Sequence, residues 1–226
     1  MKAFATNQIR NIALAGHTGS GKTSLSEAMM WSLKQNERLG KSDDGSTVSD
    51  YDPEEQRRHH SIQTSLLPVE HDNTKINILD LPGFRDFIGD IKGSIRAADS
   101  MVLVFDATGG LDVGAETVVQ YADEYDRAKV VFINKLDKDH SSYENSLELL
   151  KKELGLRLIP LTLPVGEALE FQGVIDLIKM KMVVEDGQKV SYQDIPAEMT
   201  DAAEVAHTEL VEAAAEGDDD LMMKFL

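Results

Sequence analysis

The octapeptide from Gly16 to Thr23 constrains the fold more than any other part of this 226-residue chain. It matches the phosphate-loop pattern G-x-x-x-x-G-K-[ST], whose glycines let successive backbone N–H groups point at an anion. An apolar run over residues 9–15 predicts a buried strand before the loop, and residues 24–33 show helical apolar spacing after it. Taken alone, the octapeptide could be a chance glycine-rich turn. A helix N-terminus placed after the strand and loop favours phosphate, so the sequence predicts a nucleoside triphosphate site.

This loop supplies groups for the phosphates and for a metal ion. Lys22 is predicted to reach the terminal phosphates, and the Thr23 hydroxyl is predicted to ligate Mg²⁺. The predicted phosphate-binding residues are Gly16, His17, Thr18, Gly19, Ser20, Gly21, Lys22 and Thr23.

A second motif, N-K-x-D, follows another apolar run at residues 130–133. The Asp137 carboxylate can accept hydrogen bonds from N1–H and the 2-amino group of guanine, a donor pair that adenine lacks. The Asn134 amide can bond the O6/N7 edge, and Lys135 can lie over the ring. Four residues of this kind could form an ordinary charged turn. Downstream of a phosphate loop they predict guanine selectivity, because the wrong base would leave buried polar groups unpaired.

A third motif, D-L-P-G, begins at Asp80, at the end of a predicted strand over residues 75–80. In phosphate-loop hydrolases an aspartate at this place holds Mg²⁺, usually through water, and the glycine offers an N–H near the γ-phosphate. Asp80 is therefore a predicted metal residue and Gly83 a predicted phosphate sensor. The alternative is a plain turn that follows a strand. The three motifs occur in the order that the fold requires.

The alternation of strands and helices predicts a doubly wound, mostly parallel α/β sheet with ligands at the carboxyl ends of its strands. A turn at residues 72–74 predicts an antiparallel hairpin. A polar loop is expected to extend to about residue 60. The expected strands are 9–15, 62–70, 75–80, 101–106 and 129–134, and the expected helices start at 22 and cover 86–98, 114–126 and 142–154.

The sequence changes in character after residue 155, so we expect a core over residues 1–155 and an inserted α+β subdomain over residues 156–226. Three β-runs are expected in the subdomain, followed by a helix over 199–215 that Pro196 opens. These runs cover residues 158–165, 173–182 and 189–192.

The subdomain is strongly acidic. Residues 158–226 hold 15 acidic and 4 basic side chains, a net −11 of the −17 carried by the whole chain. This favours a basic protein partner and argues against binding nucleic acid, including sequence-specific binding. With no cysteine, disulfides and thiolate metal sites are excluded. No secretory signal or long apolar segment is found, so we expect a cytoplasmic protein that does not contact a membrane.

Together these motifs resemble the G domain of bacterial elongation factor G. The family patterns are A-H-x-D-A-G-K-T, E-Q-E-R-G-I-T-I, D-T-P-G-H-x-D-F, V-F-D-A-x-x-G-V, N-K-M-D and the opening of the family's inserted subdomain. The matching segments here are residues 16–23, 55–62, 80–87, 104–111, 134–137 and 171–181. The resemblance implies GTP/GDP and Mg²⁺ as ligands, hydrolysis of GTP at the factor site of the ribosome, and contact of the acidic subdomain with the ribosomal stalk protein.

Departures from the family pattern resemble those of its elongation factor G-like paralogues. Gly19 replaces an aspartate that in some members helps to hold a monovalent cation. Ser61 stands where a threonine completes the Mg²⁺ ligands, which leaves Thr23, Ser61 and Asp80 as the metal set. Phe84 replaces the histidine that positions the attacking water, so the resemblance assigns catalysis to Lys22, Gly83 and the position of Phe84.

The loss of that histidine leaves two function classes open. One is a ribosome-stimulated GTPase, for which Phe84 predicts a slower rate. His59 or His60 could compensate, or both could be solvated side chains of a mobile loop. The other is a hydrolysis-poor GTP-binding module with a role in regulation or ribosome protection. The family also returns to the sheet with a further strand after the insertion. Because the sequence stops at Leu226, we expect an incomplete sheet, a truncated subdomain and a fragment of a longer protein.

Overall fold

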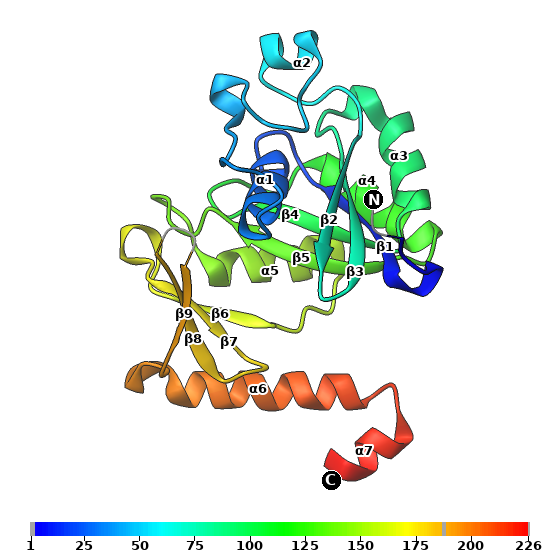
Figure 1. Cartoon of the computed structure of the whole chain (residues 1–226). Helices are drawn as coiled ribbons and strands as arrows, with labels where there is room; N and C mark the ends of the chain where they lie inside the picture. The colour runs from blue at the N-terminus through cyan, green and yellow to red at the C-terminus, as the bar shows by residue number, and fades with distance from the viewer. Residues whose placement is uncertain (1–2, 187–188, 226) are drawn as a thin grey trace. The chain divides into compact units, whose positions relative to one another are not determined.

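The computed structural model describes residues 3–186 and 189–225. The chain forms two compact units, Met1–Asn134 and Lys135–Leu226, each with its own sheet (Figure 1). The predicted boundary at residue 155 stays a prediction. Within the described ranges, no helix has both the length and the apolar character needed to span a membrane.

The first unit is built on a five-stranded sheet in the order β2-β3-β1-β4-β5. Only β2 runs antiparallel to its neighbour β3, so the expected doubly wound, mostly parallel sheet is confirmed. Because β1 is central and the chain leaves it first to one side and then to the other, ligands are expected at its carboxyl end. The strands are β1 Ile9–Ala15, β2 Ser65–His71, β3 Thr74–Asp80, β4 Ser100–Asp106 and β5 Ala128–Asn134.

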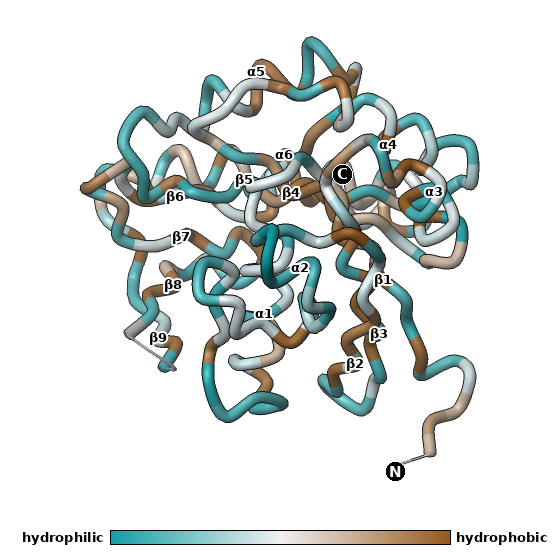
Figure 2. Tube along the Cα trace, turned by 90° about the horizontal axis from the view of Figure 1, so that it is seen from above, coloured by the Kyte–Doolittle hydropathy of each residue, from teal (hydrophilic) through white to brown (hydrophobic). Residues whose placement is uncertain are grey.

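Helices bury both faces of this sheet. Leu14 of β1 and Ile78 of β3 are fully buried and pack with Met30 of α1. Ala13, which alternation directs to the opposite face, is equally buried, and α3 and α4 pack against β1 and β4. The apolar residues of β2 and β3 are brown in Figure 2. The helices are α1 Lys22–Ser32, α3 Ile88–Ala97 and α4 Val113–Glu124.

One element of the first unit differs from the expectation. The predicted polar loop contains a short helix, α2 Pro53–Arg58. The Asp52 side chain accepts a hydrogen bond from the Glu54 N–H at 2.8 Å, and Pro53 occupies the first turn, so the helix is locally encoded. β2 correspondingly begins at Ser65 and not at residue 62.

The second unit contains a four-stranded antiparallel sheet in the order β6-β7-β8-β9. The expected single run over residues 173–182 is wrong: it forms two strands joined by a turn, because the Asp176 carboxylate accepts the backbone N–H groups of Ile178 and Lys179, both at 3.0 Å. The elements are α5 Tyr143–Leu154, β6 Thr162–Val165, β7 Gly173–Asp176, β8 Lys181–Asp186, β9 Lys189–Gln193, α6 Thr200–Ala215 and α7 Asp219–Phe225.

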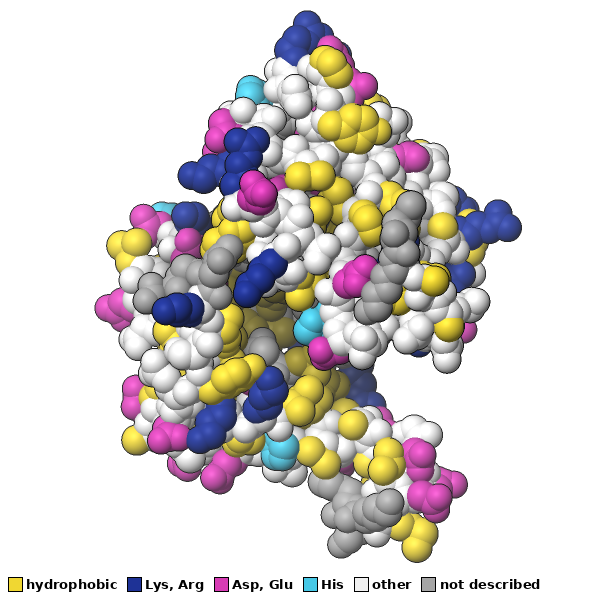
Figure 3. Space-filling model, viewed as in Figure 1, with side chains coloured by type: hydrophobic (Ala, Val, Ile, Leu, Met, Phe, Trp, Pro, Cys, Tyr) yellow, Lys and Arg dark blue, Asp and Glu magenta, His cyan; other side chains and the backbone are white. Residues whose placement is uncertain are grey.

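Helix α6 closes the core of the second unit. Its Ala203 is buried with Ile175 and Leu177 from the sheet side. His207 Nδ1 lies 2.7 Å from the Leu177 carbonyl oxygen, so this imidazole ties the helix to the sheet. The opposite side of α6 remains exposed. Acidic side chains (magenta) also gather near the start of α7, where Asp218, Asp219 and Asp220 follow one another (Figure 3).

Candidate nucleotide site

The phosphate loop follows β1 directly and packs tightly against the neighbouring strands. A Cβ at Gly16 would lie 2.4 Å from the Val104 carbonyl oxygen of β4. Gly21 has a φ of 98°, and a Cβ there would lie 2.3 Å from the Asn134 side-chain nitrogen. A larger residue at position 16 would push the loop off the sheet, whereas at position 21 it would displace the Asn134 amide and strain a backbone that favours glycine.

Lys22 lies within this loop and is almost fully buried. Its Nζ donates to the carbonyl oxygens of Gly16 and His17, both at 3.0 Å. Burial lowers the pKa of Lys22 to about 8, and the nearby carboxylates of Asp80 and Asp50 oppose this fall. The loop therefore holds a buried ammonium group, whose attraction for an anion is little weakened by water.

Asp80, at the end of β3, is buried and has an unsatisfied oxygen. Its Oδ2 accepts from Ser26 Oγ at 3.4 Å, whereas Oδ1 has no hydrogen-bond partner among the described residues. Burial raises the pKa of Asp80 to about 6, against the effect of Lys22. The hydroxyls of Thr23 and Ser49 also lower this pKa, although neither is positioned to donate a hydrogen bond to Oδ1. A buried carboxylate oxygen without a partner calls for a cation or a donor.

Among the three predicted metal residues, Thr23 lies next to both Ser61 and Asp80. Thr23 Oγ1 and Ser61 Oγ lie 3.4 Å apart, and Thr23 is close enough to affect the pKa of Asp80. Hydroxyl and carboxylate oxygens are the hard ligands that Mg²⁺ prefers. The donor set therefore fits Mg²⁺, with Oδ1 of Asp80 as the oxygen that lacks a partner. Two further buried hydroxyls of the loop, Thr18 Oγ1 and Ser20 Oγ, also have no partner in the described part of the chain.

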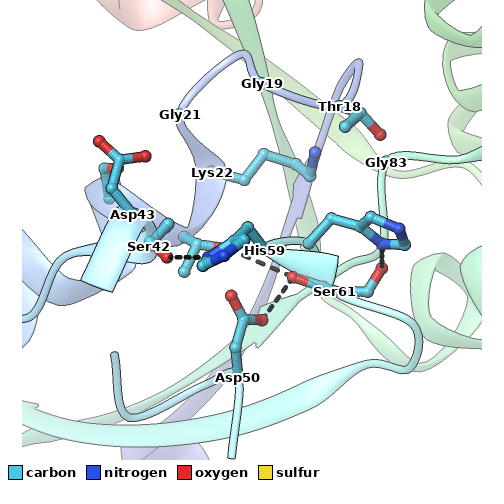
Figure 4. Close-up of a pocket in the computed structure, with 13 residues that line it drawn as sticks. Thr18, Gly19, Gly21, Lys22, Ser42, Asp43, Asp50, His59, Ser61 and Gly83 are labelled. Atoms are coloured by element: carbon cyan, nitrogen blue, oxygen red, sulfur yellow. Dashed lines mark hydrogen bonds between the residues drawn. The ribbon is translucent and has the colours of Figure 1, made fainter. Parts of the chain in front are cut away.

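One residue of the site was not predicted from the sequence. Asp50 is buried in the loop before α2, and its Oδ1 accepts from Ser61 Oγ at 2.7 Å (Figure 4). It also lines the same pocket as Lys22 and Gly83. Asp50 therefore orients the predicted metal-ligating hydroxyl of Ser61. No motif marked it, because its role depends on how the loop folds back over α1.

Two further buried carboxylates hold that loop in place. Glu27 of α1 accepts from the N–H groups of Val48 at 2.6 Å and Gly40 at 3.2 Å. Glu55 of α2 accepts from the N–H of Ile62 at 2.8 Å. Hydrogen bonds to charged groups are worth about 1.5–3 kcal/mol each. These contacts fix the segment that carries Ser61.

We expect Glu27→Gln to lower the free energy of unfolding by about 2 kcal/mol, because one acceptor oxygen becomes a donor that opposes a backbone N–H. Urea unfolding followed by the fluorescence of Trp31, the single tryptophan, measures this change. The exposed Glu37→Gln is the matched control and should stay within about 0.5 kcal/mol of the parent. Equal stabilities of the two variants would refute the role of Glu27.

Gly83 brings the end of β3 onto the phosphate loop. A Cβ at Gly83 would lie 2.5 Å from the Thr18 backbone nitrogen and 2.7 Å from Lys22 Nζ. Figure 4 shows Gly83 beside Thr18 and Lys22. The next residue, Phe84, is 40% exposed, and its ring packs against that of His60. The Phe84 side chain thus starts one residue after the contact of Gly83 with Thr18 and Lys22.

The guanine motif begins at the end of β5. Asn134 Nδ2 donates to the Ser20 carbonyl oxygen at 2.8 Å, so this amide supports the phosphate loop. Lys135 has a φ of 63° and starts the second unit. Asp137 is exposed and lies 3.2 Å from Lys138 Nζ. The base-reading roles of Asn134, Lys135 and Asp137 stay predictions.

Known proteins are similar to this chain in sequence and in fold. Residues 7–220 match the model of the elongation factor Tu GTP binding domain. The chain is similar to elongation factor G of Thermotoga sp. strain RQ2, with 36% identity over 97% of the chain, and to elongation factor G of Thermotoga maritima, with 35% identity over the same share. It spans 32% of the length of each. A crystal structure of a protein from Thermus thermophilus superposes with a TM-score of 0.89 and 32% identity, over 96% of this chain and 33% of that one.

Proposed function

Because the chain belongs to the family of elongation factor Tu GTP binding domains, we propose that it binds Mg²⁺·GTP and hydrolyses it to GDP and phosphate on the ribosome, as an elongation factor G-like factor. We further propose that this occurs in the cytoplasm. The observation that carries the proposal is the convergence of buried Lys22, the unpaired oxygen of Asp80 and the hydroxyls of Thr23 and Ser61 beside the phosphate loop.

In this proposal Lys22 and the backbone N–H groups of the loop bind the β- and γ-phosphates. Transfer of the phosphoryl group passes through a loose transition state, so fixed charge and geometry account for most of the catalysis. Mg²⁺, held by Thr23, Ser61 and Asp80, would neutralise charge on the phosphate oxygens. Gly83 would donate its N–H towards the γ-phosphate, since it already packs against Lys22 Nζ.

A second candidate is a GTP-binding module that hydrolyses poorly. Phe84 favours it, because a phenyl ring has no polar atom with which to hold a water molecule. A side chain that positions or deprotonates water typically contributes about 10²–10⁴-fold to a rate.

GTP turnover with and without ribosomes, measured on the protein at its full length, separates the two candidates. Stimulation by ribosomes of about 100-fold or more supports the GTPase. Tight GTP binding with no stimulation supports the regulatory module instead. Failure to bind GTP would refute both.

We also propose that the exposed side of α6 binds a basic protein domain, such as that of the ribosomal stalk. Glu204, Glu209 and Glu212 are all exposed on this helix, whose other side is buried in the core of the second unit. Like-signed charges gathered on one surface raise association rates with oppositely charged partners.

Reversal of these three charges to lysine should slow association with ribosomes by about tenfold at low ionic strength and reduce the salt dependence of the rate. Stopped-flow mixing of labelled factor with ribosomes measures it. A matched control places the same total charge change on α5, at the exposed Glu144, Glu148 and Glu153. If both triple variants slow association equally, overall charge and not the surface of α6 is responsible.

A further inference from the structure

His60 and Phe84 form a ring pair at the edge of the nucleotide pocket. Their ring centroids lie 4.5 Å apart with an interplanar angle of 59°, a tilted arrangement that aromatic pairs favour. Residue 60 belongs to the loop that carries Ser61, and residue 84 directly follows Gly83. The ring pair therefore joins the two segments that border the terminal-phosphate end of the phosphate loop.

The position of the imidazole follows from its neighbours on both sides. Next to it in sequence, Ser61 places its hydroxyl 3.4 Å from Thr23 Oγ1, within the predicted metal set. Across the ring contact, Gly83 packs so closely on the loop that a Cβ there would lie 2.7 Å from Lys22 Nζ. His60 itself lines the pocket formed by these residues. Its ring thus lies between the predicted metal ligands and the predicted phosphate-binding residues.

One nitrogen of this ring is free to hold water. His60 Nδ1 lies 3.3 Å from the Ser61 carbonyl oxygen, which favours the tautomer with its proton on Nδ1. Within residues 3–186 and 189–225, Nε2 has no hydrogen-bond partner, so in that tautomer it is an acceptor. Packing against the Phe84 ring restricts the rotation of the imidazole, which reduces the entropy lost when it orders a ligand.

The neighbouring histidine, His59, lines the same pocket but makes different contacts. His59 directly follows α2 with a φ of 55°, and its Nδ1 lies 3.3 Å from the Ser42 carbonyl oxygen (Figure 4). Its side chain is exposed, whereas that of His60 is partly buried. The two histidines, which the sequence alone could not tell apart, therefore have different surroundings.

We propose that His60, held by Phe84, positions the water that attacks the γ-phosphate. This rests on the proposed GTPase function. The water oxygen forms a bond to the γ-phosphorus as the bond from that phosphorus to the β–γ bridging oxygen breaks. His60 Nε2 accepts a hydrogen bond from the water and gains no net proton, because the water proton ends on the released phosphate. Phe84 supports the imidazole and excludes bulk solvent, and needs no polar atom of its own.

Single-turnover GTP hydrolysis on ribosomes, with the full-length protein, tests the assignment. His60→Phe keeps an aromatic ring in the pair and removes its nitrogens. We expect it to lower the rate by about 100-fold or more while the GTP dissociation constant stays within about threefold of the parent. His60→Gln, whose amide oxygen can accept from water, should exceed the rate of His60→Phe by about tenfold. His59→Phe is the matched control and should hydrolyse GTP within about threefold of the parent.

The exchanged pair His60→Phe/Phe84→His sharpens the test, because it preserves both rings and moves the imidazole across the contact. Recovery of about tenfold or more over His60→Phe supports the inference. A fast parent whose His60→Phe variant is within about threefold of it would overturn the inference and leave the GTPase proposal intact. A parent that binds GTP but is not stimulated by ribosomes would overturn both the inference and the GTPase proposal. The GTP dissociation constants of the variants show that each of them is folded.

Discussion

Lys22→Met is expected to weaken binding of Mg²⁺·GTP by about 100-fold or more. The ammonium is buried in the loop, so an incoming phosphate meets a charge already stripped of water. Two charge-assisted hydrogen bonds to phosphate oxygens, at about 1.5–3 kcal/mol each, account for a loss of this size. In the variant, the negative charges of Asp50 and Asp80 are no longer offset by the Lys22 ammonium, so they would repel the phosphates.

Equilibrium titration with a fluorescent GTP analogue measures the effect, and urea unfolding shows whether the variant is folded. Lys152→Met removes the same charge from an exposed position on α5 and should bind GTP as the parent does. Lys22→Arg keeps the charge but not the compact ammonium, so an intermediate affinity is expected. A dissociation constant for Lys22→Met within about threefold of the parent would show that Lys22 does not bind the phosphates.

The sheet of the first unit was predictable from sequence because its strands are apolar and its motifs lie at strand ends. The run 9–15 became β1 with the predicted bounds, and its Ala13 and Leu14 are fully buried. Asp80 and Asn134 end β3 and β5, as expected of residues placed at the carboxyl edge of a parallel sheet. A strong local pattern and the shared direction of the parallel strands determined these features together.

The loop between α1 and β2 was not predictable in the same way. Its shape depends on buried carboxylates that accept backbone N–H groups far along the chain, such as Glu27 with Val48. A polar side chain in a helix gives no local sign that it will be buried. Asp50 was missed because nothing in the loop sequence marks it as a buried partner of Ser61. By contrast, α2 carried a readable signal, since Asp52 followed by Pro53 is a helix start.

In the second unit, a continuous apolar run in the sequence concealed a turn. Residues 173–182 read as one strand, because Ile178 and Met180 continue the apolar character through the turn. The Asp176 carboxylate, which accepts the backbone N–H groups of Ile178 and Lys179, and a φ of 51° at Met180 reverse the chain there. Aspartate is a frequent turn residue for this reason, but its presence within a run does not by itself locate a turn.

Asp137→Asn is expected to cost GTP binding about 2–4 kcal/mol, roughly 30- to 1,000-fold in affinity. The carboxylate offers two acceptor oxygens for the N1–H and 2-amino groups of guanine. An amide offers one acceptor and one donor, and that donor faces a guanine N–H. Asp137 is exposed, with Lys138 at 3.2 Å as a weak ion-pair partner, so the substitution should leave the fold unchanged.

Xanthine carries an oxygen where guanine has the 2-amino group, so the Asp137→Asn variant should gain affinity for xanthosine triphosphate as it loses affinity for GTP. Competition of GTP, ATP and xanthosine triphosphate against a fluorescent nucleotide measures this exchange for the parent and the variant. Asp139→Asn, which changes an exposed aspartate two residues further along, is the matched control and should retain the selectivity of the parent. The assignment of Asp137 fails if the parent binds ATP as tightly as GTP. It also fails if Asp137→Asn weakens GTP and xanthosine triphosphate equally, because only a residue that reads the base edge can invert the preference between them.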